Sequence, residues 1–78
     1  MITMKQVLEI IARSLVDHPE AVSVTEVEAE DSVTLELRVA EDDMGKVIGK
    51  QGRIAKAIRT VVKAAANREN KRVVVEII

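Results

Sequence analysis

The sequence predicts an α+β fold in the order helix, strand, strand, short helix, glycine loop, long helix, strand. Apolar residues recur at helical spacing near the N-terminus and again after Gly52. Between these segments, apolar and polar residues alternate strictly from Val33 to Val39, and the chain closes on the β-branched run RVVVEII. At 78 residues, 47% of them hydrophobic, we expect one domain spanning residues 1–78.

A capping box opens the first predicted helix. Thr3 and Gln6 are three residues apart, so each side chain can satisfy the backbone N–H of the other residue. The apolar stripe behind this box consists of Val7, Leu8, Ile11 and Leu15, flanked by Ile10. Asp17-His18-Pro19 ends the helix, because the residue before a proline is disfavoured in the helical conformation. A helix of about four turns is therefore expected.

Two strands should follow. The segment VSVTEVEAE is rich in β-branched residues, but its alternation slips between Val24 and Val27, and a bulge or a late strand start would explain the slip. The segment from Val33 to Val39 has the pattern of a strand with one buried face. Glu30-Asp31-Ser32 between them suits a tight hairpin, although no glycine fixes the turn type.

The second half of the chain should contain a short helix and a long one. Glu41, Asp42 and Asp43 precede the short helix from Met44 to Ile48, where the helix dipole favours negative charge. The long helix begins after Gly52 and is amphipathic. Its apolar positions are Ile54, Ile58, Val61, Val62 and Ala65, and its opposite side carries Arg53, Lys56, Arg59 and Lys63. We assign Ile58, Val61 and Val62 mainly to packing, or in part to a dimer seam.

The net charge of −1 hides a strong asymmetry along the chain. The segment from Asp17 to Asp43 contains ten acidic residues and one basic residue. The segment from Met44 to Arg72 contains nine basic residues and one acidic residue. Such asymmetry indicates a surface that faces a polyanion, and the alternative is two solvated faces that keep the domain soluble.

The glycine loop GKVIGKQG, from Gly45 to Gly52, fits one of three phosphate-binding templates. Gln51 stands where a P-loop needs a hydroxyl, and the loop joins two helices instead of following a strand. The dinucleotide pattern GxGxxG fails because the chain contains no GxG. The third template, GXXG between two helices, is met by Gly49-Lys50-Gln51-Gly52 and is the nucleotide-clamping loop of KH domains. Glycine at both ends should let a sugar–phosphate chain approach without a Cβ in the way.

The stretch DDMGKVIGKQGRIAKAIRTVV resembles the small stand-alone bacterial KH proteins of the KhpA family, and the likeness extends from Thr3 to Ile78. The resemblance implies a type II KH domain, α-β-β-α-α-β, with a three-stranded mixed sheet packed against three helices. It also implies a cytoplasmic protein that binds single-stranded RNA as a post-transcriptional regulator or RNA chaperone. The implied partners are a second copy in a homodimer and a KH protein of the Jag (KhpB) family in a heterodimer.

The resemblance assigns RNA contacts by position. An apolar floor for the bases should be formed by Val47, Ile48 and Ile54. The loop backbone should hold about four nucleotides through Gly49, Lys50, Gln51 and Gly52. Flanking phosphates should meet Arg53 and Lys56, and the far rim should be lined by Lys71 and Arg72.

Other chemistry finds little support in the sequence. His18 is the single histidine and lacks co-ligands for zinc, the serines lack a nucleophile motif, and the chain has no cysteine. We therefore expect no catalysis, metal, cofactor or small-molecule substrate, and no membrane span or export signal. Without aromatic residues bases cannot stack on rings, so one domain should bind weakly and paired domains should compensate. The rival interpretation is a protein-interaction adaptor with little RNA binding of its own.

Overall fold

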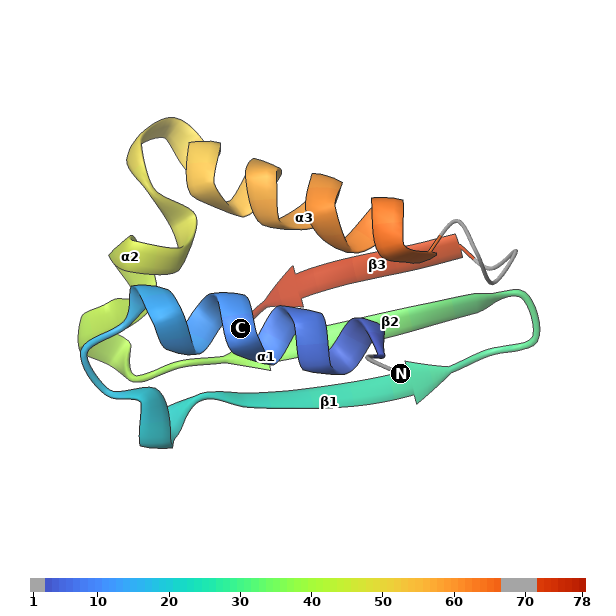
Figure 1. The fold of residues 1–78 in the computed structure, drawn as a ribbon, viewed down its shortest axis with the longest axis horizontal. Helices are drawn as coiled ribbons and strands as arrows, with labels where there is room; N and C mark the ends of the chain where they lie inside the picture. Colours follow the sequence, from blue (N-terminus) through green and yellow to red (C-terminus); the bar gives the residue numbers. More distant parts are fainter. Residues whose placement is uncertain (1–2, 67–71) are drawn as a thin grey trace.

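The computed structural model describes residues 3–66 and 72–78 as a three-stranded sheet with helices packed on one face (Figure 1). The helices are α1 (Met4–Leu15), α2 (Met44–Ile48) and α3 (Arg53–Ala66). The strands are β1 (Ser23–Glu28), β2 (Ser32–Arg38) and β3 (Arg72–Ile77). Short 3-10 turns cover Pro19–Ala21, Glu41–Asp43 and Lys50–Gly52. The predicted element order is confirmed.

The predicted capping box is present at the start of α1. The Thr3 backbone N–H donates to Gln6 Oε1 at 2.8 Å, and the Gln6 backbone N–H donates to Thr3 Oγ1 at 3.1 Å. The helix ends at Leu15, and Pro19 begins the first 3-10 turn. Local sequence signals therefore set both ends of α1, as expected.

The sheet is mixed, with strand order β1-β2-β3. β1 and β2 are antiparallel in a continuous register from Ser23 opposite Arg38 to Glu28 opposite Val33, whereas β2 and β3 are parallel. This register leaves no room for the bulge considered in β1. The slip in apolar alternation instead places Val27 on the outer face, where it is 50% exposed. A turn closed by a bond from the Ala29 N–H to the Ser32 carbonyl joins β1 to β2.

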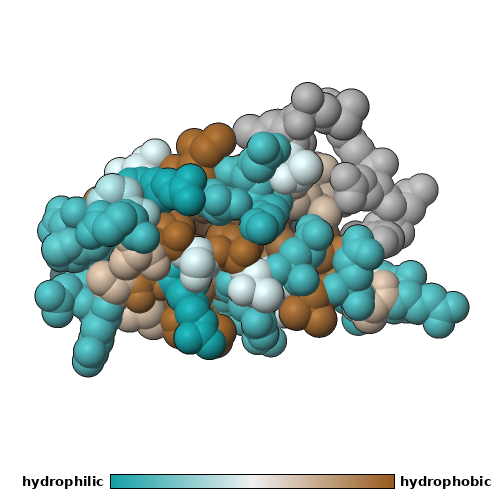
Figure 2. All heavy atoms as spheres, turned by 90° about the horizontal axis from the view of Figure 1, so that it is seen from below, coloured by the Kyte–Doolittle hydropathy of each residue, from teal (hydrophilic) through white to brown (hydrophobic). Residues whose placement is uncertain are grey.

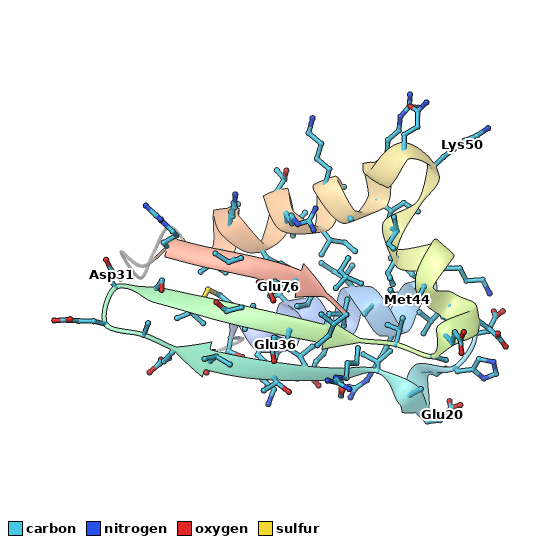
Figure 3. All side chains as sticks on the ribbon, turned by 180° about the vertical axis from the view of Figure 1, so that it is seen from behind. Glu20, Asp31, Glu36, Met44, Lys50 and Glu76 are labelled. Carbon is cyan, nitrogen blue, oxygen red and sulfur yellow. The ribbon has the colours of Figure 1, made fainter. Side chains whose placement is uncertain are left out.

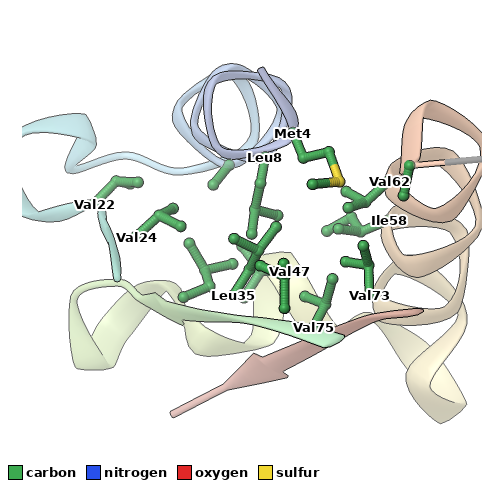
Figure 4. Close-up of a cluster of buried hydrophobic side chains, with 14 residues drawn as sticks. Met4, Leu8, Val22, Val24, Leu35, Val47, Ile58, Val62, Val73 and Val75 are labelled. Carbon is green, nitrogen blue, oxygen red and sulfur yellow. The ribbon is translucent and has the colours of Figure 1, made fainter. Parts of the chain in front are cut away.

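The hydrophobic core lies between the sheet and the helices (Figure 4). Leu8 of α1 and Leu35 of β2 are fully buried in it. Val62 of α3 is fully buried as well, and Val75 of β3 is nearly so. The alternation predicted for β2 is confirmed, since its apolar residues enter this core while Thr34, Glu36 and Arg38 do not. Aliphatic side chains thus form the core between the three helices and the sheet.

The exposed edge at β1 is mostly hydrophilic. In the view from below, hydrophilic side chains cover most of the surface and apolar ones emerge between them in separate groups (Figure 2). Glu26 and Glu28 are both exposed on this edge strand. Charged side chains on an edge strand discourage pairing with a strand of another molecule. None of the helices in the described part of the chain is long and apolar enough to cross a bilayer.

Candidate nucleic-acid interface

The loop that joins α2 to α3 has an unusual backbone. Gly49 ends α2 with φ 75° and ψ 176°, Gln51 has φ 59°, and Gly52 has φ 74°. The chain is held in this turn by bonds from the Gly49 N–H to the Gly45 carbonyl at 2.9 Å and from the Gly52 N–H to the Gly49 carbonyl at 3.2 Å. Residues with a Cβ rarely adopt positive φ, so glycine at both ends makes this conformation accessible.

The two glycines of the loop have different surroundings. A Cβ on Gly49 would lie 2.5 Å from Cγ1 of Ile54, so the missing side chain of Gly49 lets its own protein pack closely. A Cβ on Gly52 would meet nothing within 4 Å. The open space that a nucleotide strand could use therefore lies at Gly52, whereas the sequence led us to expect it at both glycines.

The tip of the loop is exposed. Lys50 projects away from the body of the molecule (Figure 3), and Gln51 beside it is exposed too. Ile48 is 37% exposed and Ile54 is half-buried, so both retain apolar surface next to the loop. Val47 is fully buried in the core, so its predicted place on the floor is wrong. It cannot touch a base, because the path of α2 turns its side chain toward the sheet.

Basic residues of the loop and α3 form a cationic side that has no acidic partner among the described residues. Lys50, Arg53, Lys56, Arg59 and Lys63 are all exposed. Arg53 donates to the Gln51 side chain at 3.3 Å, which keeps its guanidinium beside the loop. None of the five forms an ion pair with a described residue, whereas Arg13 and Lys46 both pair with carboxylates. The positive charge of this side is therefore free to meet a polyanion.

The predicted far rim does not lie near the loop. Arg72 begins β3, and its backbone N–H donates to the Asp31 carbonyl at 3.2 Å. Asp31 and Lys50 lie at opposite ends of the molecule (Figure 3). The structure therefore does not bring Arg72 together with the GXXG loop. Lys71, also predicted for the rim, lies outside the described residues.

A buried carboxylate, that of Asp43, holds the other end of α2. Its Oδ1 accepts from the Asp17 backbone N–H at 3.2 Å, and its Oδ2 accepts from the His18 backbone N–H at 3.0 Å. The Lys46 ammonium lies 3.5 Å from Oδ1 and also pairs with the Asp17 carboxylate. Asp43 thus ties the start of α2 to the segment that follows α1.

This role of Asp43 differs from the predicted one. The carboxylate was expected to complement the dipole of α2, but the Asp43 side chain makes no capping hydrogen bond to that helix. It is fully buried and serves a segment 25 and 26 residues earlier in the chain. The available sequence signal is its spacing: Asp43 precedes the buried Val47 by four residues, which places both on one side of a helix.

The surroundings of Asp43 set its protonation and that of Lys46. Burial acts to raise the pKa of the Asp43 carboxyl, but the N–H donors of Asp17 and His18 and the Lys46 ammonium outweigh it, so the pKa lies below its ordinary value. A hydrogen bond to Asp17 raises the pKa of Lys46 above its ordinary value, against the opposing effect of burial. Both groups are therefore charged at neutral pH.

An open apolar groove of about 280 Å³ lies between α1 and α3. Its lining is entirely apolar and consists of Ile11, Leu15, Ile54, Ala57, Ile58 and Val61. Leu15 is 39% exposed and Val61 is 49% exposed. Of the residues assigned mainly to packing, Ile58 and Val62 are buried as expected, whereas Val61 faces outward along this groove.

The described residues contain no cluster of metal ligands. No three His, Asp or Glu side chains among them come together as a metal site requires. His18 is half exposed, and its Nδ1 lies 3.5 Å from the Glu20 carboxylate. The Ser14 hydroxyl donates to the Ile10 carbonyl within α1. The loop and the cationic side of α3 are accordingly the candidate site of this chain.

Comparison with known proteins identifies the family. The family model of the KhpA/KhpB KH domain matches residues 5–77. The chain belongs to the KhpA family of KH-domain proteins. A protein named RNA-binding protein KhpA from Clostridium acetobutylicum is 75% identical over 75 residues, covering 96% of this chain and all of the relative. One of the same name from Aquifex aeolicus is 50% identical over 78 residues, covering 100% of this chain and 99% of the relative.

Solved structures support the KH fold. A single-residue variant of Aquifex aeolicus Era bound to GDP·AlF4⁻ matches with a TM-score of 0.70 and 19% identity, over 95% of this chain. Era in complex with MgGDPNP and nucleotides 1506–1542 of 16S ribosomal RNA matches with a TM-score of 0.71 and 19% identity, also over 95% of this chain. The chain spans 29% and 28% of those two proteins. The expected type II arrangement, a three-stranded mixed sheet with three helices, is therefore confirmed.

Proposed function

We propose that this member of the KhpA family binds single-stranded RNA by its sugar–phosphate backbone at the GXXG loop, without catalysis, in the cytoplasm. The observation that carries the proposal is the exposed tip of Lys50 and Gln51 beside basic side chains that have no acidic partner among the described residues. The names of the relatives, RNA-binding protein KhpA, support the same activity.

The mechanism follows from the geometry of the loop. A phosphate at Gly52 meets no Cβ. The Arg53 N–H already donates to the Lys50 carbonyl, so the donors that the start of α3 can offer are the next N–H groups of its first turn, which have no partner within the helix. Lys50 contributes a mobile positive charge over the same path, and Arg53 and Lys56 extend that charge along α3. Ile48 offers apolar contact to bases next to the clamped backbone, whereas Ile54 lines the groove between α1 and α3. Because these contacts are mainly to backbone, we expect weak dependence on sequence at the loop.

Charge reversal at the loop tip tests the proposal. Lys50→Asp with Gln51→Asp places negative charge where phosphates should lie, while both glycines and the core stay unchanged. We expect affinity for a labelled single-stranded RNA to fall at least about tenfold, with an unchanged circular dichroism spectrum. The matched control, Lys5→Asp with Ala29→Asp, changes net charge equally at exposed positions outside the loop and α3. Equal affinity of both variants would refute the loop mechanism.

A salt titration separates RNA binding from the rival adaptor function. The logarithm of the binding constant should fall with the logarithm of salt concentration with a slope of about −0.7 per neutralised phosphate. Clamping about four nucleotides then predicts a slope between about −2 and −3. A slope near zero would instead favour a protein-interaction adaptor.

We further propose that the apolar groove between α1 and α3 joins two copies of the chain. Val61 and Leu15 expose apolar surface there, and a small domain gains buried area by pairing. Once RNA is bound at one loop of a dimer, the second loop is present at a high effective concentration. This would compensate for weak binding by a single domain, as suits a post-transcriptional regulator or RNA chaperone. A Jag/KhpB-family protein is the expected alternative partner. Val61→Glu should halve the solution mass measured by light scattering, and an unchanged mass would exclude this seam.

A further inference from the structure

Arg59 occupies a position that backbone clamping does not explain. It lies on α3, and its Nε donates to the backbone carbonyl of Val75 at 3.3 Å. β3 is an edge strand of the sheet, so the carbonyl of Val75 takes its hydrogen bond from this side chain instead of from a further strand. The contact ties α3 to the open edge of β3.

This anchor leaves the outer part of the guanidinium unused. A guanidinium carries five N–H donors, of which the bond to Val75 takes one. The remaining four belong to the two terminal nitrogens, and they have no partner among the described residues. Because Nε is fixed, the free fork is held in place before a ligand arrives, which lowers the conformational entropy lost on binding.

The free guanidinium nitrogens of Arg59 lie along the expected path of an RNA strand bound at the GXXG loop. Arg59 follows Gly52 by seven residues, or about 10 Å along the axis of α3. Lys56 lies between them in sequence on the same cationic side, so a strand leaving Gly52 along this side passes Arg59 next. The RNA strand would then run between α3 and the edge of β3, because the Arg59 side chain reaches that edge.

We propose that Arg59 reads bases and gives the site a preference for bases with two adjacent hydrogen-bond acceptors. Guanine presents O6 and N7 in this way, and a bidentate arginine is the usual partner of that pair. Cytosine presents O2 and N3, whereas adenine N1 and N7 each lie beside the N6 amino donor, and uracil O2 and O4 lie on either side of the N3–H donor. The chain has no aromatic residue on which bases could stack. The guanidinium of Arg59 is therefore the group beside β3 that can distinguish one base from another.

The inference rests on the proposed function and can be tested apart from it. Labelled oligouridine octamers, with two central positions changed to guanine, cytosine or adenine, are titrated with the full chain by fluorescence anisotropy. The wild type should bind the guanine and cytosine probes about tenfold more tightly than the adenine probe and unchanged oligouridine. Arg59→Lys keeps the charge but loses the fork, so the ratio of affinities between the guanine or cytosine probes and the uridine or adenine probes should fall to about one.

Two further variants make the outcome unambiguous. Lys63→Gln, one turn further along α3, should weaken all four probes equally and reduce the salt slope by about 0.7. Arg59→Gln, whose amide can still donate to Val75, serves if Arg59→Lys unfolds, and it should lose the same preference. An unchanged preference in the Arg59 variants, or an equal loss for all four probes, would overturn the inference. A wild type that binds no probe would overturn the proposed function as well.

Discussion

The two ends of the short helix α2 have opposite roles. At the first end, Asp43 is buried and each carboxylate oxygen accepts a backbone hydrogen bond from the segment after α1. At the other end, Gly49 leads into an exposed loop whose tip makes few contacts with the rest of the protein. Burial and hydrogen bonding therefore make the first end a structural anchor, and exposure leaves the other end free to bind. The carboxylate fixes the helix, and the fixed helix presents the loop.

Removing the buried carboxylate should have the largest effect. Asp43→Ala leaves the N–H groups of Asp17 and His18 without their partner and leaves Lys46 with fewer countercharges. Partly buried donors left without a partner are costly, and the change also empties the buried site of the carboxylate, so we expect the melting temperature to fall by about 15 °C. Thermal circular dichroism measures it, with the exposed neighbour change Asp42→Ala as control, expected within about 3 °C of the wild type. A similar small shift for both variants would mean that the α2 junction does not depend on Asp43.

A side chain at Gly49, the first glycine of the loop, should have the second-largest effect on stability. Gly49→Ala combines a backbone conformation that is nearly restricted to glycine, costing about 1–3 kcal/mol, with a clash against Ile54. We expect the melting temperature to fall by about 10 °C. The double change Gly49→Ala with Ile54→Ala removes the clash, so it should be less destabilised than the sum of the two single changes. Strict additivity would contradict the contact with Ile54.

A side chain at the second glycine should separate binding from stability. Gly52→Ala meets no atom within 4 Å, so only its positive φ opposes it, and we expect the melting temperature to fall by about 5 °C or less. Its methyl group would point into the space assigned to the nucleotide strand, so RNA affinity should fall about tenfold. Gly45→Ala, within α2 and also free of contacts, is the matched control and should leave RNA binding unchanged. Equal RNA affinity of these two variants would remove Gly52 from the interface.

The smallest expected effect is the pH dependence of the Asp43 contacts. The pKa of Asp43 is lower in the folded protein than its ordinary value of 3.8, so the carboxylate stabilises the fold above that value. This contribution is lost as the pH falls from about 3.8 through the lower folded-state pKa. The difference in melting temperature between the wild type and Asp43→Asn should therefore shrink by a few degrees between about pH 5 and about pH 2.5. A difference that stays constant would show that ionised Asp43 does not contribute.

Much of the fold could be predicted because its signals are local. Thr3 and Gln6 satisfy each other across three residues, and the alternation of β2 follows from one buried face. The loop was likewise visible as two glycines around Lys50 and Gln51. The slip at Val27 was not resolved, because a strand at the edge of a sheet can place an apolar residue outward without any bulge.

The candidate site was predicted less completely, because burial and partner choice are not local. Val47 and Ile48 are neighbours in an apolar pair, and the path of α2 over the core is what buries the first and exposes the second. Arg72 looked like a continuation of the cationic segment, but β3 carries it to the end of the molecule away from the loop. Nothing in the sequence distinguishes Arg59 from the other basic residues of α3, because its hydrogen bond to Val75 depends on β3 lying beside α3.

The sequence by itself determined the element order, the capped start of α1, the alternating strand and the loop flanked by glycines. Each of these depends on residues within about four positions of one another, where spacing alone decides which groups can meet. The tertiary structure alone decided the pairing of Asp43 with residues 25 and 26 positions away and the anchoring of Arg59 to a carbonyl 16 positions away. Such contacts form only when packing of the apolar core brings distant segments together, and no local pattern encodes that meeting.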